Sequence, residues 1–211
     1  MKTIKKFILG QKDRMTQIFD ENGVAVPVTA INFDKNIITA IKEAEKDGYS
    51  AVQVGTVEKS DKKTNKAQKA DNKAFRFIKE FRTDAEFNKG DEISIDIFEE
   101  GEKVEITSIS KGKGFQGGVK LHGFSGGRRS HGNKHAEREV GSIGAGSTPS
   151  RVWKGKKMPG RMGSNRITIK NLTIAKIDKE NNRILVKGAI AGKPGTLVEL
   201  KVVSYPEKQS K

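Results

Sequence analysis

Cysteine is absent from this chain of 211 residues, and its absence excludes a disulfide framework, a thiolate metal cluster and a cysteine nucleophile. Long apolar runs are missing as well. Near the amino terminus, Phe7-Ile8-Leu9 is far too short for the core of a signal peptide or for a membrane span. We therefore expect a soluble, unprocessed protein in the cytoplasm.

Acidic residues are scarce in one part of the chain. Residues 111–170 contain two of the 26 acids, Glu137 and Glu139, against fourteen of the 41 Lys and Arg, so this segment has a net charge of +12. The rest of the chain contributes only +3 to the total of +15. The same segment holds fourteen of the 23 glycines and all three histidines. A local cationic, glycine-rich block indicates a polyanionic partner, most commonly nucleic acid.

Outside this block, the dominant hydrophobic period is two, which is the period of half-buried strands. Predicted strands lie at 24–33, 49–57, 93–97, 104–109, 167–178, 182–190 and 196–205. Closely spaced strands on both sides of one insertion predict a mainly β fold: a closed β-barrel made of residues 1–110 and 167–211, with a basic extension at 111–166 inserted between strands. We expect the polar run 59–73 to be a solvated loop or a short surface helix, and the tail 206–211 to be frayed.

The basic extension lacks sustained helical or strand periodicity, and its apolar residues are too sparse for a core of its own. Its order should therefore come from binding a partner. Glycine permits close backbone approach, and Lys and Arg neutralise phosphates. Phe115, Phe124 and Trp153 lie between the charges and can stack on bases. Packing against the barrel is the favoured alternative for Phe115, and both alternatives stay open for Trp153.

Three patterns in the extension resemble enzyme motifs, and each fails on its context. Residues 112–117 fit the dinucleotide-binding glycine pattern, with Glu137 at the expected distance, but the glycines that follow make a helix improbable. Residues 155–162 approach a phosphate-binding loop, yet Arg161 and Met162 replace its Lys and hydroxyl residue. His131 and His135 lack the adjacent glutamate of a zinc protease. We expect no catalytic residues, cofactor or metal.

Four segments together resemble a known family: MTQIFDENGVAVPVT (15–29), SKGKGFQGGVKLHGF (110–124), HGNKHAEREVGSIG (131–144) and TPSRVWKGKKMPGRMG (148–163). In order and spacing they are similar to the universal large-subunit ribosomal protein L three family, in its shorter bacterial form, and the resemblance covers nearly the whole chain. It implies a β-barrel of the translation-protein type. It also implies an extension that runs through ribosomal RNA toward the peptidyl transferase centre.

The chain departs from that family's pattern at three positions. Arg14 replaces a turn glycine, so either the turn differs or Arg14 contacts RNA, since a left-handed conformation would cost a non-glycine residue about 1 kcal/mol. Leu121 stands where many members have a basic residue. Ser147 precedes Thr148-Pro149, where some members carry a methylated glutamine, so that modification is excluded.

These observations predict a structural, non-catalytic constituent of the large ribosomal subunit, located in the cytoplasm within the ribosome. Its partners would be large-subunit rRNA and neighbouring ribosomal proteins, with no membrane and no small-molecule substrate, and the resemblance implies a role early in subunit assembly. The alternatives are a non-ribosomal RNA chaperone or architectural nucleic-acid-binding protein and, less favoured, a nucleotide-dependent enzyme. The predicted rRNA-binding residues are Lys111, Lys113, Lys120, His122, Arg128, Arg129, His131, Lys134, His135, Arg138, Ser147, Arg151, Trp153, Lys154, Lys156, Lys157, Arg161 and Arg166.

Overall fold

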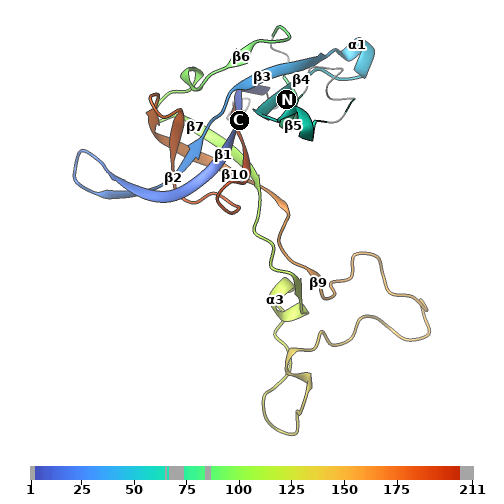
Figure 1. Ribbon diagram of the computed structural model, residues 1–211. Coiled ribbons are helices and arrows are strands. Elements are labelled where there is room, and N and C mark those ends of the chain that lie inside the picture. The colour runs from blue at the N-terminus through green and yellow to red at the C-terminus, as the bar shows by residue number, and fades with distance from the viewer. Residues whose placement is uncertain (1–2, 65, 67–73, 84–86, 205–211) are drawn as a thin grey trace, which may run out of the picture. The chain divides into compact units, whose positions relative to one another are not determined.

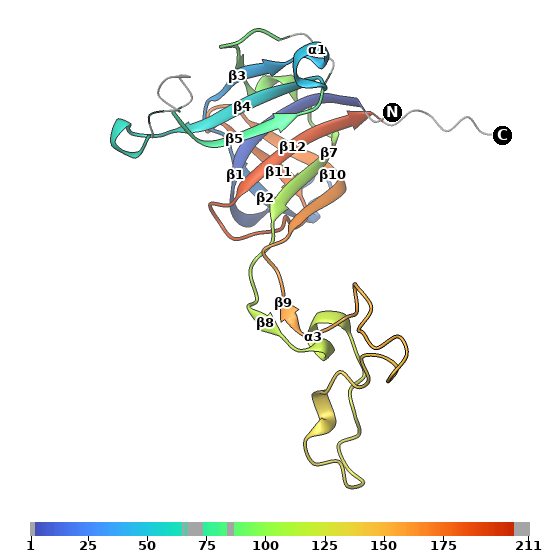
Figure 2. The ribbon, with the colours of Figure 1, turned by 90° about the vertical axis from the view of Figure 1, so that its right-hand side faces the viewer.

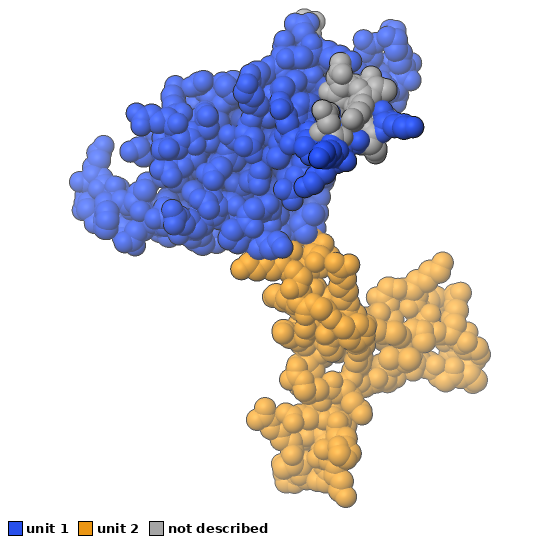
Figure 3. All heavy atoms as spheres, viewed as in Figure 1, with its two compact units in different colours: residues 1–109, 166–211 blue, residues 110–165 orange. Residues whose placement is uncertain are grey.

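The computed structural model describes residues 3–64, 66, 74–83 and 87–204. The chain forms two compact units, one made of residues 1–109 and 166–211 and the other of residues 110–165 (Figure 3). The first unit is built from strands with only short helical turns, so the prediction of a mainly β protein is confirmed.

Six antiparallel strands of the first unit close into a barrel in the order β1-β12-β7-β10-β11-β2 (Figures 1 and 2). The strands are β1 (Thr3–Phe19), β2 (Ala25–Asn32), β7 (Lys103–Ile109), β10 (Arg166–Asp178), β11 (Arg183–Lys187) and β12 (Leu197–Ser204). Closure pairs the strand edges with one another, so within this circle no edge stays open to other chains.

A second sheet in the same unit has the order β5-β4-β3-β6. Its strands are β3 (Asn36–Lys42), β4 (Ala51–Glu58), β5 (Phe75–Phe81) and β6 (Glu92–Ile93), and the short helix α1 (Ala44–Asp47) joins β3 to β4. Two 3-10 helical turns lie in the chain around this sheet: η1 (Asp61–Lys63) follows β4, and η2 (Ile95–Ile97) follows β6.

The core is one cluster that combines side chains of the barrel strands, such as Ile106 and Leu200, with side chains of the second sheet, such as Val54. Strand β1 contacts both groups. Successive side chains of a strand point to opposite faces, yet Phe7, Ile8 and Leu9 are all buried, so both faces of β1 are covered here. The Phe7 ring stacks on Phe81 of β5 at a centroid distance of 4.5 Å. Buried Asn36 of β3 accepts a hydrogen bond from the Leu9 amide (3.0 Å) and donates one to the Leu9 carbonyl (2.9 Å), which ties the two sheets together.

Most predicted strands are observed within a few residues of their expected positions, as β2, β4, β7, β10, β11 and β12. The predicted strand at 93–97 is wrong beyond Ile93, because the Ser94 hydroxyl accepts a hydrogen bond from the Asp96 amide and closes a 3-10 turn. Strands β1, β3 and β5 were not predicted. Most of the run 59–73 beyond η1, and the tail 206–211, lie outside the described residues.

Arg14 lies within strand β1 and not in a left-handed turn. The pairing of β1 with β2 shifts register between Lys12 and Met15, so Arg14 occupies an irregularity of the strand. The backbone there avoids positive φ, and the strain considered for a non-glycine residue does not arise.

Candidate nucleic-acid interface

The second unit begins as a narrow antiparallel ribbon that holds the two ends of the insertion together. The Ser110 amide donates a hydrogen bond to the Asn165 carbonyl (2.9 Å). Further along, the Lys113 amide donates to the Met162 carbonyl, and the Met162 amide donates to the Gly114 carbonyl, both at 2.9 Å. Strands β8 (Phe115–Gln116) and β9 (Gly160–Arg161) continue the ribbon side by side (Figure 2).

Two glycines permit close backbone approaches in this unit. A Cβ on Gly163 (φ +77°) would lie 2.2 Å from the Lys111 carbonyl oxygen, and a Cβ on Gly126 (φ +73°) would lie 2.2 Å from the Glu137 carbonyl oxygen. Any side chain at these positions would displace a backbone segment. The glycine content therefore has a structural reason here, since it lets segments without a core run against one another.

A short helix, α3 (Gly118–His122), follows the ribbon, so the expectation that no helix follows residues 112–117 is wrong. It ends at Gly123, whose left-handed conformation (φ 72°) lets its amide donate to the Val119 carbonyl. Five residues make little more than one turn, much shorter than the helix of a dinucleotide-binding unit. Glu137, the acid at the motif's spacing, forms an ion pair with Arg129 at 2.8 Å.

The second unit has almost no interior. Of residues 110–165, only Gly118 is buried. Twelve Lys and Arg against two Glu give these residues a net charge of +10. All the predicted rRNA-binding side chains are exposed except His122, which is half-buried. The unit is thus a chain of exposed cations held by backbone hydrogen bonds and not by a hydrophobic core.

Some of the predicted binding residues have partners within the protein. The His122 ring nitrogen Nε2 lies 2.9 Å from the Met158 carbonyl oxygen. The Arg151 guanidinium lies over the Trp153 ring, 4.8 Å from its centroid, and Trp153 is 59% exposed. The other two aromatics of this unit differ in exposure. Phe115 is 75% exposed, and its expected packing against the barrel stays a prediction, whereas Phe124 is half-buried.

Arg166 belongs to the first unit, where it forms an ion pair with Glu199 of β12. The Glu199 side chain is only 8% exposed, and Lys79 lies 3.7 Å from its other oxygen. The buried Glu199 carboxylate keeps Arg166 and Lys79 close to it, because removing a cationic partner would leave its negative charge buried and less well compensated, which is unfavourable. Sequence reasoning missed Glu199, and no local signal identifies it because 33 positions separate it from Arg166.

His131 and His135 are both exposed, and His131 has a positive φ of 59° next to Gly132. Across the part of the chain that the structure describes, no group of three or more His, Asp or Glu side chains is arranged to hold a metal ion. In the same part of the chain, no helix is long and apolar enough to cross a membrane.

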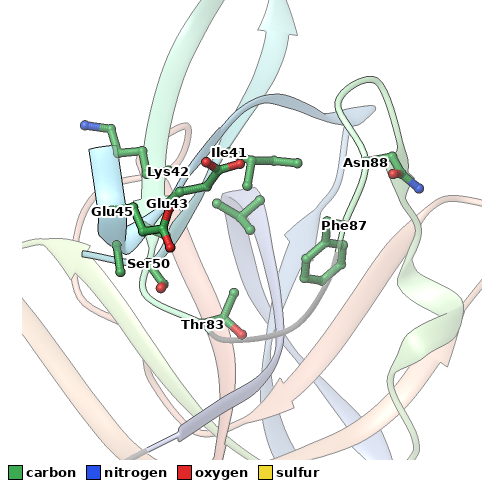
Figure 4. Close-up of a pocket in the computed structure, with 11 residues that line it drawn as sticks. Ile41, Lys42, Glu43, Glu45, Ser50, Thr83, Phe87 and Asn88 are labelled. Carbon is green, nitrogen blue, oxygen red and sulfur yellow. The ribbon is translucent and has the colours of Figure 1, made fainter. Parts of the chain in front are cut away.

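A surface hollow of about 710 Å³ lies beside α1 in the first unit, lined by residues that include Ile41, Glu43, Thr83 and Phe87 (Figure 4). Lys42 borders it, but its ammonium donates to the Tyr49 hydroxyl (2.8 Å) and lies 3.6 Å from Glu80. The Tyr49 hydrogen bond and the nearby carboxylates raise the pKa of Lys42, so the amine stays charged and is a poor base. Glu43, another residue of the lining, is ion-paired with Lys46.

The profile of the family described as ribosomal protein L3 matches residues 73–183. A protein from Staphylococcus epidermidis named large ribosomal subunit protein uL3 is 46% identical over 210 residues, covering 92% of this chain and 95% of the relative. The chain belongs to the ribosomal protein L3 family.

Two further relatives of this L3-family chain have the same name, large ribosomal subunit protein uL3. The protein of Finegoldia magna is 45% identical over 203 residues, covering 93% of this chain and 97% of the relative. The protein of Alkaliphilus metalliredigens is 47% identical over 201 residues, covering 92% and 95%. Similarity of this extent spans both units, including the basic one.

Proposed function

We propose that this L3-family protein is a structural constituent of the large ribosomal subunit, with large-subunit rRNA as its main partner and no catalytic role. The observation that carries the proposal is the second unit, in which +10 of charge is displayed with only Gly118 buried. A unit of this composition cannot offset its ordering entropy by burying its own side chains. Neutralisation by phosphates, with release of their counterions, supplies the missing stabilisation.

The two units have different tasks in this proposal. The barrel, which we assign to the translation-protein type, docks on folded RNA by shape. Residues 111–166 act as the extension that runs between RNA segments, where glycines allow close approach and Lys and Arg meet phosphates. The eighteen predicted contact residues named above are part of this proposal. Arg166 and Arg129 differ from the others, since each must exchange a protein carboxylate for a phosphate.

We place the far end of the extension at residues 141–151, which contain one charged residue, Arg151. Such a segment can approach RNA closely without the repulsion or attraction of many charges. In this proposal it lies toward the peptidyl transferase centre, where it affects the conformation of the surrounding RNA and supplies no group to the reaction. The protein joins the subunit early in assembly, contacts neighbouring ribosomal proteins and resides in the cytoplasm within ribosomes.

Sedimentation of a lysate that contains the full-length tagged protein tests the proposal. The tagged chain should co-sediment with large subunits at one copy per particle, and high-salt washing should remove little of it once the extension is enclosed by RNA. A substoichiometric, polydisperse distribution over RNA would favour an RNA chaperone or architectural protein instead. A free pool that binds nucleotide would contradict a structural role.

A further inference from the structure

The hairpin of β1 and β2 continues beyond the barrel as a two-stranded ribbon. β1 pairs with β12 only as far as Gln11, whereas its pairing with β2 continues to Phe19. β2 pairs with β11 only from Val28 onward. Residues 13–27 therefore project from the closed circle of strands (Figure 1, the blue hairpin). We call this segment the β1–β2 ribbon.

One face of the ribbon packs against the protein. Ile18 and Val26, which are opposite each other, lie against a small cluster formed by Val28, Ala30 and Leu185. Because side chains alternate along a strand, their neighbours point the other way. This outer face consists of Met15, Gln17, Phe19, Ala25 and Pro27, all of them exposed.

The outer face is apolar and carries no charge. Met15 is 48% exposed and Phe19 67% exposed, and Val24 beside them in the turn is 58% exposed. In a protein with 32% charged residues, a contiguous face whose only polar member is Gln17 is an exception. Exposed apolar patches of this kind mark interaction sites, since burying them releases water.

The net charge of the ribbon identifies the kind of partner. Within residues 13–27, Asp13, Asp20 and Glu21 outnumber Arg14, so the ribbon has a net charge of −2 in a chain of +15. This net negative charge disfavours a phosphate backbone as the partner. A protein surface with an apolar centre and a rim of Lys or Arg would be attracted to it.

The ribbon is also preorganised for docking. The Asp20 carboxylate accepts hydrogen bonds from the backbone amides of Asn22 (3.1 Å) and Val24 (2.8 Å), and Gly23 takes the left-handed conformation (φ +75°) that closes the turn. A turn fixed by its own hydrogen bonds loses little conformational entropy when it binds.

From these observations we propose that the outer face of the β1–β2 ribbon docks another protein of the large subunit, through an apolar patch rimmed by basic residues. This inference rests on the proposed function and names the class of partner, a protein and not RNA, for a surface distant in sequence from the basic extension.

The test uses the full-length chain with the photoreactive substitution Phe19→p-benzoylphenylalanine, incorporated into ribosomes in cells. Irradiated and purified large subunits should yield a cross-link to one ribosomal protein, at a peptide that contains apolar side chains next to Lys or Arg. Cross-linking to rRNA, or none from chains present in the subunit, would overturn the inference and leave the proposed function standing. Absence of the chain from large subunits would refute the proposed function itself.

Variants then measure binding between the purified full-length chain and the cross-linked protein by calorimetry. The double substitution Met15→Thr, Phe19→Thr removes the apolar anchors and should raise the dissociation constant about thirtyfold, the effect of losing one interface hot spot. Glu21→Lys should weaken binding most at low salt. Ile97→Thr is the matched control, because Ile97 is 38% exposed elsewhere in the same unit, and it should leave binding unchanged. Equal effects of the control and the double variant would contradict a specific surface.

Discussion

Neutralising three lysines of the extension is expected to weaken the salt dependence of rRNA binding. Lys154, Lys156 and Lys157 are exposed, and no ion pair in the described part of the chain involves them. Each is therefore free to meet a phosphate, and each phosphate contact contributes about 0.7 to 0.9 to the slope of log affinity against log salt. Replacing all three with Gln should lower the slope by about two units if most of them touch phosphate.

This change of slope is large enough to measure. With a slope lower by about two, a fourfold rise in salt costs the variant about sixteenfold less affinity than it costs the unsubstituted protein. Filter binding or fluorescence anisotropy with a large-subunit rRNA transcript, from about 50 to 200 mM monovalent salt, covers that range. Circular dichroism of both proteins checks that the strands of the first unit are intact.

A control with the same change of charge separates phosphate contact from net charge. Lys35, Lys89 and Lys103 of the first unit are likewise exposed and without an ion pair among the described residues. Their replacement by Gln removes three charges, yet it should change the slope much less. An unchanged slope in the Lys154, Lys156 and Lys157 variant would show that this cluster faces solvent. Equal changes in both variants would show that the slope reports overall charge, which would refute the assignment of contacts.

Four more outcomes follow from the structure. In the isolated protein, amides of residues 110–165 should exchange hydrogen rapidly while the barrel strands stay protected, and uniform protection would contradict an extension without a core. Ser147→Asp or Trp153→Ala should allow subunits to form but slow assembly or change sensitivity to antibiotics of the peptidyl transferase centre. For Trp153→Ala the loss is about 1 to 3 kcal/mol if the ring lies on a base. Ribosomes identical to wild type would refute the placement of the far end of the extension at residues 141–151. Gly10→Ala should destabilise the first unit by about 1 to 3 kcal/mol in thermal or chemical unfolding, because its Cβ would lie 2.7 Å from both Ile31 and Phe33, whereas Gly144→Ala, with nothing within 4 Å, should not. Asp178 accepts hydrogen bonds from the Asn181 side chain, from the Asn181 backbone amide and from Arg183, and these lower the pKa of Asp178. The stability that they add is present above about pH 4 and is lost as pH falls through the lowered pKa. In urea titrations, the difference in unfolding free energy between the unsubstituted protein and Asp178→Asn should therefore shrink on acidification, and a constant difference would contradict this.

Most strands were readable from the sequence because β-branched residues or alternating apolar and polar residues mark them, as in β2 and β12. β1 was missed because its apolar residues Phe7, Ile8 and Leu9 are consecutive and do not alternate, and all three are buried. At 93–97 the alternation of Ile was present, yet a local hydrogen bond to Ser94 changed the backbone from strand to 3-10 turn. Period alone does not distinguish these outcomes.

The character of the candidate interface was predictable, because charge and glycine content are properties of composition. Its partnerships were not. The ion pair of Arg166 with Glu199 and the approach of His122 to Met158 join residues 33 and 36 positions apart, and only the folded backbone brings them together. The helix α3 was missed because Gly118 lowers helix propensity, while its close packing against Phe124 and Val140 leaves no room for a larger residue.

Because the two ends of the insertion are joined at the barrel, the insertion can vary without disturbing the barrel. Ile109 pairs with Arg166 in the barrel, and the next residues inward, Ser110 and Asn165, are linked by a backbone hydrogen bond of 2.9 Å. For the barrel, the insertion is thus a loop whose ends are already closed, and doubling the length of such a loop costs only about 0.6 kcal/mol. The extension can therefore lengthen, shorten or change its sequence, while the barrel that carries it keeps its register.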